Sequence, residues 1–462
     1  MSVSVIVPVF NGKEFIDRSI SSILTELGQD DELILVDDGS SDGTFGMLCG
    51  RYSTDGRILM AACSDNRGPA AARNTGIRLS RGEWIAFCDA DDEWLPGKLS
   101  AQLRYAAENP EVRIVLTREE TVCDDESART GQLAEYARND TVHFRNAMIR
   151  RDVFDRIGLM DESMRIREDT EWLVRARTSD IRMGSVPEPL YRRHLRDGGL
   201  SANATEEGRK ERMLGAFAKG IRGKRPETEN SELLSILVPV YNAEKYVAEA
   251  VSSCKALHRN CELILINDGS SDGSLSVLRR ILSDRLYPAG LSVTLVHRKH
   301  KGQACSRNDA FRLSRGKYLL YLDADDYFTP GAIDLMADTA DKSPEAFVIS
   351  AMCRDFLSPD LTEEESSKLK INPDPYRRML AGCMLMRRSV FEQIGTYDET
   401  MATSETAQWV MRIRDAGLSI REIGEVTLMR RYHNGNLGRV NREAQMNSYM
   451  EMIRLRLKNR KG

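Results

Sequence analysis

Long hydrophobic runs are missing from this 462-residue sequence, and none approaches the roughly 18 residues that a membrane-spanning helix needs. The chain enters an apolar stretch at residues 3–8 with no basic segment or cleavage site before it, so we predict no secretory signal and expect a cytoplasmic protein. An excess of one charge is missing too. The formal net charge of −4 argues against a nucleic-acid partner held by bulk charge.

Cysteine pairs at metal-ligand spacing are also absent. The nine cysteines are odd in number and show no CxxC spacing, which excludes both a disulfide framework and a zinc site of the usual pattern. With 41% hydrophobic and 29% charged residues, the composition is that of an ordinary globular protein. The chain is too long for one ordinary domain, so we expect two or three.

The sequence repeats itself once. Asp89-Ala90-Asp91-Asp92 returns as Asp323-Ala324-Asp325-Asp326, and the offset is 231 at Pro8 and Pro239 but 234 at Asp89 and Asp323. A period this long indicates duplicated domains rather than a solenoid, whose repeats span roughly 20–50 residues. We predict an N-terminal domain (1–203), a linker (204–231), a second domain (232–440) and a basic C-terminal helix (441–462).

Each half alternates short apolar strands with amphipathic helices. Strand-like runs at 3–7, 33–36 and 84–88 alternate with helical stretches such as 13–27, whose apolar residues share one face. This alternation predicts an α/β fold with a mostly parallel sheet and helices on both faces. The carboxyl ends of such strands meet at one edge, where open sheets bind ligands.

Polar turns follow the first two strands of the N-terminal half. Gly39 permits a tight turn, and Ser40, Ser41 and Asp42 are either turn and cap residues or ligand contacts. We favour ligand contact for Asp38, because an acid beside another acid at a strand end is otherwise costly.

A second set of polar residues predicts a metal and an anion. Asp89 and Asp91 point the same way on an extended chain, and hard divalent cations take such oxygen ligands, whereas Asp92 is predicted to cap a helix near residues 94–96. Arg73 lies about one turn into a helix opened by glycine and proline, where an anion can bind. His194 can complete the coordination begun by Asp91.

Asp169 stands at the start of a later predicted helix, in the pair Glu168-Asp169. It is either a general base within reach of an acceptor hydroxyl or a helix-terminal acid favoured by the macrodipole.

Taken in this order, the motifs resemble the family 2 glycosyltransferases, and the resemblance covers residues 1–203 and again 233–440. It implies two tandem GT-A domains, which are Rossmann-like. It further implies an inverting transfer from a nucleotide-sugar, with a UDP-sugar favoured, to a hydroxyl of a glycan, lipid-linked or peptide acceptor, with acceptor contacts within 115–145. The implied base is Asp169, the implied metal is Mn²⁺ or Mg²⁺ on Asp91 and His194, and the implied donor contacts are Pro8, Val9, Asn11, Asp38, Arg73 and Asp89.

The second half keeps the donor-side counterparts Asp268, Arg307, Asp323 and Asp325. It departs in three places. Ala310 replaces a glycine, Thr406 stands where Asp169 stands, and the histidine is displaced by one position to His433.

Threonine cannot act as a general base near neutral pH, and Glu405 would have to reach in from a neighbouring position. We therefore predict that the second domain is weak or inactive. The alternatives are a bifunctional polysaccharide synthase with two working sites and a sugar-nucleotide-binding protein without catalysis.

The basic residues of 441–462 follow apolar residues at helical spacing. This pattern is typical either of peripheral contact with the anionic inner face of a membrane or of a packed helix with a solvated tail.

Overall fold

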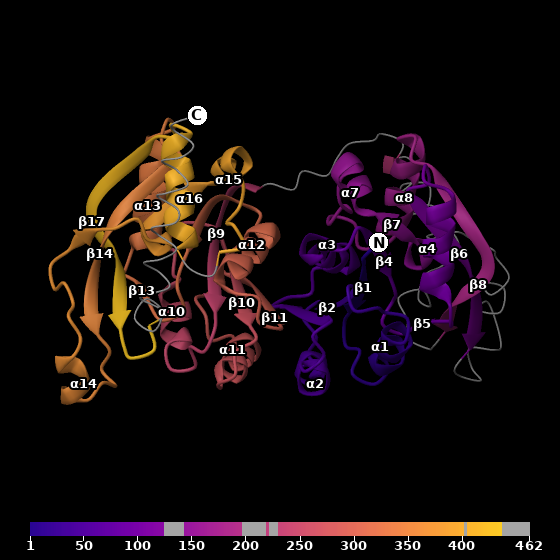
Figure 1. Ribbon diagram of the computed structural model, residues 1–462, viewed down its shortest axis with the longest axis horizontal. Helices are drawn as coiled ribbons and strands as arrows, with labels where there is room; N and C mark the ends of the chain where they lie inside the picture. The colour runs from indigo at the N-terminus through magenta and orange to yellow at the C-terminus, as the bar shows by residue number, and fades with distance from the viewer. Residues whose placement is uncertain (124–142, 196–218, 221–229, 402–403, 437–462) are drawn as a thin grey trace. The chain divides into compact units, whose positions relative to one another are not determined.

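The computed structural model describes residues 1–123, 143–195, 219–220, 230–401 and 404–436. The chain divides into two compact units, Met1–Glu227 and Thr228–Gly462 (Figure 1). The predicted helix at 441–462, most of the predicted linker and residues 124–142 of the predicted acceptor segment lie outside the described residues. None of the helices that the structure describes is both long and apolar enough to span a bilayer.

In the N-terminal domain, β1 (Val3–Val9) lies between β2 (Glu32–Asp37) and β4 (Trp84–Phe87) and is parallel to both. β3 (Ile58–Cys63) continues the parallel sheet beyond β2. On the other side β7 (Met148–Arg150) runs antiparallel to β4 and β6, and β8 pairs with β6 and β5. The remaining elements are α1 (Ile16–Leu24), α2 (Thr44–Tyr52), α3 (Pro69–Leu79), β5 (Glu93–Trp94), α4 (Lys98–Glu108), β6 (Ile114–Cys123), η1 (Phe144–Asn146), α7 (Arg151–Ile157), α8 (Glu168–Thr178) and β8 (Met183–Leu195).

The C-terminal domain repeats this topology. β9 (Asn230–Val240) lies between β10 (Cys261–Asp268) and β12 (Gly316–Tyr321), parallel to both, and β16 (Met384–Arg387) runs antiparallel to β12. The other elements are α10 (Val247–Ser253), α11 (Ser274–Ser283), β11 (Ser292–Arg298), α12 (Gln303–Leu313), β13 (Tyr327–Phe328), α13 (Ala332–Lys342), β14 (Val348–Leu357), α14 (Glu363–Ser367), β15 (Tyr376–Arg377), η2 (Ala381–Cys383), α15 (Arg388–Ile394), α16 (Glu405–Asp415) and β17 (Ile420–Tyr432). The predicted α/β fold class, with a mostly parallel sheet in each of two tandem units, is confirmed.

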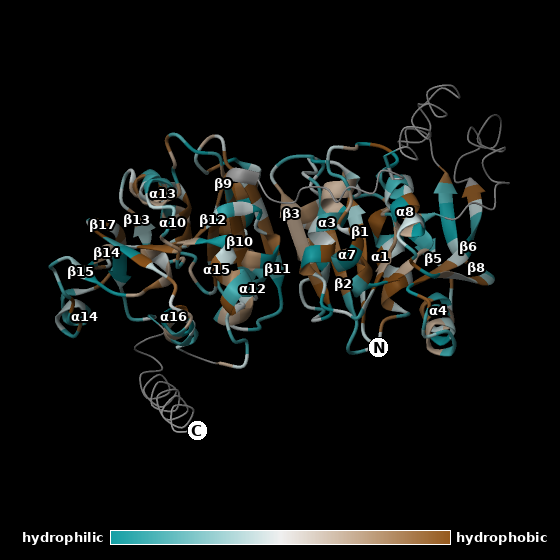
Figure 2. Ribbon diagram, turned by 90° about the horizontal axis from the view of Figure 1, so that it is seen from above, coloured by the Kyte–Doolittle hydropathy of each residue, from teal (hydrophilic) through white to brown (hydrophobic). Residues whose placement is uncertain are grey.

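The central strands are buried and mostly apolar, because helices cover both faces of the sheet (Figure 2). The first helix is shorter than the predicted 13–27. Its expected first turn is not helical, because the N–H groups of Gly12 and Lys13 donate to the side chains of Thr44 and Asp42 in the neighbouring turn. The parallel strands β1, β2 and β4 all end at the same edge, which carries Asn11, Asp38 and Asp89.

Candidate functional site

Arg73 joins two distant parts of the N-terminal domain. It projects from α3, is 7% exposed, and donates from Nη1 to Glu168 Oε1 at 2.6 Å and from Nη2 to Asp89 Oδ1 at 2.8 Å. Burial works to lower the pKa of Arg73, but the charges of Asp89, Glu168 and Asp169 outweigh it and raise that pKa. The guanidinium therefore stays charged and holds the acid at the end of β4 close to the start of α8.

Asp169 is the accessible acid of its pair. Glu168 is buried against Arg73, whereas Asp169 is half-buried at the second position of α8. Its Oδ1 accepts the N–H of Thr170 at 2.7 Å, so the carboxylate is oriented locally. Burial raises the pKa of Glu168 despite the nearby Arg73. Of the two neighbours, Asp169 is thus the one whose carboxylate is not committed to Arg73, and its role as a general base stays a prediction.

In the turn after β4, Asp89 and Asp92 have surroundings that shift their pKa values in opposite directions. Burial works to raise the pKa of Asp89, but Arg73, Arg145 and Arg193 outweigh it and lower that pKa, so this acid stays ionised. Asp92 is 3% exposed, and burial together with the two nearby acids raises its pKa well above the usual range. Of these two acids Asp89 is therefore the one that stays charged, and its contact with a donor stays a prediction.

Asp92 does not cap a helix, and that prediction is wrong. β5 occupies Glu93–Trp94, and α4 begins only at Lys98 behind Gly97. Asp92 instead accepts the hydroxyl of Tyr191 at 2.8 Å and the N–H of His194 at 2.9 Å. The His194 ring nitrogen Nε2 lies 3.4 Å from Glu93 Oε1. Metal ligation by His194 with Asp91 stays a prediction.

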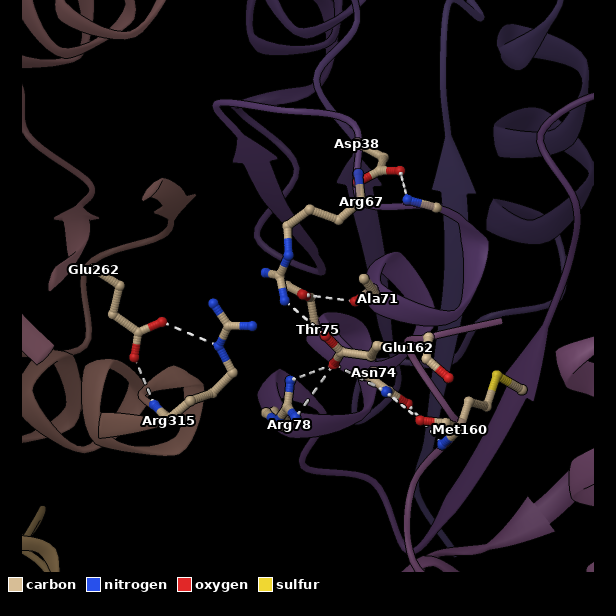
Figure 3. A network of polar contacts seen from close by, with 12 residues as sticks. Asp38, Arg67, Ala71, Asn74, Thr75, Arg78, Met160, Glu162, Glu262 and Arg315 are labelled. Atoms are coloured by element: carbon tan, nitrogen blue, oxygen red, sulfur yellow. Dashed lines mark hydrogen bonds and ion pairs between the residues drawn. The ribbon is translucent and has the colours of Figure 1, made fainter. Parts of the chain in front are cut away.

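Asp38 has a structural role at the edge of the sheet where the parallel strands end. Its two oxygens accept the N–H groups of Arg67 at 2.9 Å and Gly68 at 2.7 Å, and so hold the start of α3 (Figure 3). Burial raises the pKa of Asp38 against these two bonds. Ligand contact through Asp38 stays a prediction, and any such contact would share a carboxylate that already fixes the loop.

The serine-rich turn contacts the end of β1. Asn11, at φ 50°, accepts the N–H of Ser41 at 2.9 Å, while Ser40 Oγ accepts the N–H of Asn11 at 2.7 Å. Asp42 Oδ1 accepts the N–H of Thr44 at the start of α2. All three turn residues thus make turn and cap contacts in the structure.

The end of β1 itself places Pro8 half-buried and Val9 at 3% exposure. The Val9 carbonyl accepts the N–H of Asp38 at 2.9 Å. Donor contact by Pro8, Val9 and Asn11 stays a prediction.

Two groups near the site escaped the sequence analysis. Glu162 accepts from Arg67 at 2.7 Å and from Asn74 at 3.1 Å, tying α3 to the segment before α8 (Figure 3). Arg145 of η1 binds both oxygens of Glu119, at 2.6 and 3.1 Å. Neither set of contacts leaves a local sequence pattern, because the bonded residues are at least 26 positions apart in the chain.

The burial of Asp37 leads us to predict that the stability of the N-terminal domain depends on pH. Burial raises its pKa from 3.8 to about 6 in the folded domain, against hydrogen bonds from Ser40. The folded state therefore holds this proton more tightly than the unfolded state, so the free energy of unfolding falls as pH rises from about 4 to about 6. The C-terminal domain carries neutral Asn267 at this position.

We expect Asp37→Asn to remove roughly 2 kcal/mol of that fall between pH 4 and pH 7. The measurement is urea unfolding of the full chain at both pH values, with Asp30→Asn as a control, since Asp30 is an exposed aspartate in the same domain. Identical pH dependence in wild type and Asp37→Asn would contradict the assignment.

The C-terminal domain builds the same frame. Arg307 donates to Glu405 Oε1 at 2.5 Å and to Asp323 Oδ1 at 3.0 Å, and the Asp268 carboxylate accepts two backbone N–H groups at the start of α12. Thr406 Oγ1 lies 2.5 Å from Nη1 of Arg307. Glu405 therefore corresponds to Glu168 and is committed to the arginine, which removes it as a substitute base.

The structure changes the interpretation of two of the three departures in this domain, the lost glycine and the displaced histidine. A Cβ on Gly76 would lie 2.5 Å from Ile6 Cγ2, so the glycine that Ala310 replaces serves packing. The strand registers pair Trp94 with Tyr191 and Phe328 with Leu428.

By this register Arg431 corresponds to His194, so His433 is displaced by two positions and not by one. His433 Nε2 nevertheless lies 3.0 Å from Asp325 Oδ2. Thr406 is left as the departure that changes the chemistry.

The acids at the end of β4 offer carboxylate oxygens of the kind that divalent cations take as ligands. Within the described ranges no three His, Cys, Asp or Glu side chains are grouped so that they could hold a metal ion. Mg²⁺ is usually bound by one or two carboxylates together with substrate phosphates and water, and that donor set fits Asp89 and Asp91. The residues thus fit a divalent cation that arrives with a diphosphate.

Comparison with known proteins gives a consistent assignment. The family model of glycosyl transferase family 2 matches residues 4–158 and 235–395. An uncharacterized glycosyltransferase of Rickettsia felis is 23% identical over 389 residues, which is 72% of this chain and 62% of that protein. The chain thus spans less than two thirds of this relative's length.

Two further proteins are similar over shorter stretches. The UDP-Glc:alpha-D-GlcNAc-diphosphoundecaprenol beta-1,3-glucosyltransferase WfgD of Escherichia coli is 39% identical over 108 residues, 23% of this chain and 42% of that protein. The mannosyltransferase PcManGT from Pyrobaculum calidifontis, solved in complex with GDP-Man and Mn²⁺, is 23% identical over 48% of this chain and 65% of its own, with a TM-score of 0.40.

Proposed function

The chain belongs to glycosyl transferase family 2, and from this premise we propose that its N-terminal domain moves a hexosyl group from a nucleotide-sugar to an acceptor hydroxyl with inversion. A UDP-sugar is the favoured donor. The observation that supports this most is the arginine bridge: Arg73 binds Asp89 of the metal motif and Glu168, which stands next to Asp169. Through these two contacts Arg73 positions both the acid that would bind the metal and the segment that carries the proposed base.

In the proposed reaction Asp169 takes the proton of the acceptor hydroxyl as that oxygen attacks the anomeric carbon. The bond from that carbon to the diphosphate breaks, and the nucleoside diphosphate leaves with the electron pair. Asp91, with Asp89 and His194, would hold Mn²⁺ or Mg²⁺, which when bound neutralises charge on the leaving diphosphate. Arg73 keeps Asp89 ionised and in place for this role.

We assign the C-terminal domain no transfer activity, or weak activity. Thr406 stands at the base position and contacts Arg307, while Glu405 is buried on that same arginine. A bifunctional polysaccharide synthase is the second candidate, and the contact of His433 with Asp325 is the observation that favours it. That reading would still need a base that the described residues of this site do not offer.

The acceptor we propose is a glycan carried on a lipid or a growing polysaccharide, with a peptide as the alternative. The Escherichia coli relative is named for a diphosphoundecaprenol-linked acceptor, which supports the lipid-linked choice. A cytoplasmic enzyme reaching such acceptors would work at the inner face of a membrane, and the basic residues of 441–462 suit that contact.

Donor turnover tests the proposal. UDP-, GDP- and dTDP-sugars are incubated with the full chain in Mn²⁺, in Mg²⁺ or in EDTA, and release of nucleoside diphosphate is measured. We expect turnover with a UDP-sugar that needs the metal and that EDTA abolishes. Absence of metal-dependent turnover with every donor would contradict the proposal and favour a sugar-nucleotide-binding protein.

A further inference from the structure

We propose that Tyr191 and Ser19 are positioning residues that hold the turn Asp89-Ala90-Asp91-Asp92 in the conformation that binds the metal and the donor diphosphate. The proposal rests on the function proposed above. It concerns two buried hydroxyls that touch only the protein, and it accounts for a difference between the two domains that the base position does not explain.

Tyr191 ties the two ends of the turn together. It lies on β8 with its side chain fully buried. Its hydroxyl accepts the N–H of Asp89 at 3.1 Å and donates to Asp92 Oδ2 at 2.8 Å. The other oxygen of Asp92 accepts the N–H of His194, also on β8. The phenol oxygen of Tyr191 thus hydrogen-bonds to both the first and the last residue of the turn.

Ser19 holds the same turn from α1. It is fully buried, and its Oγ lies 2.5 Å from the carbonyl oxygen of Asp92, 2.9 Å from that of Ala90 and 3.1 Å from that of Asp89. The preceding Arg18 donates to the carbonyl of Asp91 at 2.9 Å. The four carbonyls of the turn therefore face α1, and the single hydroxyl proton of Ser19 has its shortest contact with the carbonyl of Asp92. These contacts with α1 restrict the backbone of the turn and so the directions in which its carboxylates project.

The C-terminal domain shows that these hydroxyls are not needed to form the turn. Leu428 stands at the position of Tyr191 in the strand register, and Ala250 stands at the position of Ser19 on α10. The Asp325 carbonyl is still held, by Arg431 Nε at 2.9 Å. That arginine is anchored by Glu249, which occupies the place of Arg18.

In both domains an arginine thus donates to the carbonyl of the second acid of the turn, from α1 in the first domain and from β17 in the second. Only the N-terminal domain, which carries the proposed base, has the tyrosine and serine hydroxyls. Because the turn forms in both domains, we infer that the hydroxyls are needed for the turn to bind the metal and the diphosphate and not for the turn to fold. Groups that orient metal ligands without touching the metal typically change metal affinity by about 10- to 100-fold when they are removed.

The test compares Tyr191→Phe and Ser19→Ala with wild type in the full chain. Mn²⁺ affinity is titrated in the presence of UDP, and thermal unfolding is followed in parallel. We expect each substitution to raise the dissociation constant for Mn²⁺ about tenfold. Saturating Mn²⁺ should restore turnover to most of the wild-type rate, which general structural damage would not allow.

Tyr318→Phe is the matched control, because it removes a tyrosine hydroxyl that donates to Asp341 at 2.7 Å in the C-terminal domain, and it should leave Mn²⁺ affinity unchanged. Wild-type Mn²⁺ affinity in both test variants would overturn this proposal and leave the proposed function standing. If Tyr191→Phe does not fold, Ser19→Ala decides alone. A wild-type chain that binds no Mn²⁺ with UDP would overturn both proposals.

Discussion

Asp169→Asn is expected to lower the transfer rate by about 10²- to 10⁴-fold, the usual contribution of a general base, while Mn²⁺ and UDP still bind. The amide has the shape of the carboxylate and can accept the N–H of Thr170, but it cannot take a proton. Glu168 cannot replace it, because Glu168 is buried and bound to Arg73 at 2.6 Å. The measurement is single-turnover transfer at saturating donor and metal.

Thr406→Val is the matched control at the corresponding position of the C-terminal domain. It removes the hydroxyl that contacts Arg307 and should change transfer by less than about twofold. Full transfer by Asp169→Asn would show that another group removes the proton. Thr406→Asp tests the converse: a gain of transfer in the Asp169→Asn background would show that the second domain lacks only its base.

The duplication, the fold class and the loops at the sheet edge could all be predicted from sequence, because each depends on residues close together in the chain. Apolar periodicity marks strands and helices locally. Asp89 and Asp91 follow a buried strand directly, and Arg73 follows a glycine and proline at a helix start. Such short-range patterns place side chains at the ligand edge without any knowledge of tertiary contacts.

The supporting contacts could not be predicted in the same way. Tyr191 and Asp92 are 99 residues apart, and Ser19 and Asp92 are 73 apart, so neither pair leaves a local pattern. A tyrosine on a strand and a serine inside a helix are ordinary residues by composition. The misplaced cap at Asp92 has the same origin, because an acid after a strand equally suits a helix cap or a buried hydrogen-bond acceptor.

The histidine of the second domain shows a further limit. Aligning Arg-Arg-His by letters displaces it by one position, but strand pairing sets the register, and a single-residue slip moves every side chain to the other face. With Arg431 at the position of His194, the exchange of Arg18 for Glu249 becomes intelligible: the arginine comes from β17 in the second domain, and an acid on α10 at the place of Arg18 binds it.

The central claim is that the N-terminal domain carries the transfer, and inactivating each metal motif separately tests it most directly. Asp91→Asn and Asp325→Asn are matched changes in duplicated turns, compared by metal-dependent transfer with the preferred donor. We expect Asp91→Asn to lower transfer at least about 100-fold, because the charge on the leaving diphosphate is no longer neutralised. Asp325→Asn should stay within about twofold of wild type. Loss of transfer in Asp325→Asn, with or without loss in Asp91→Asn, would contradict the account.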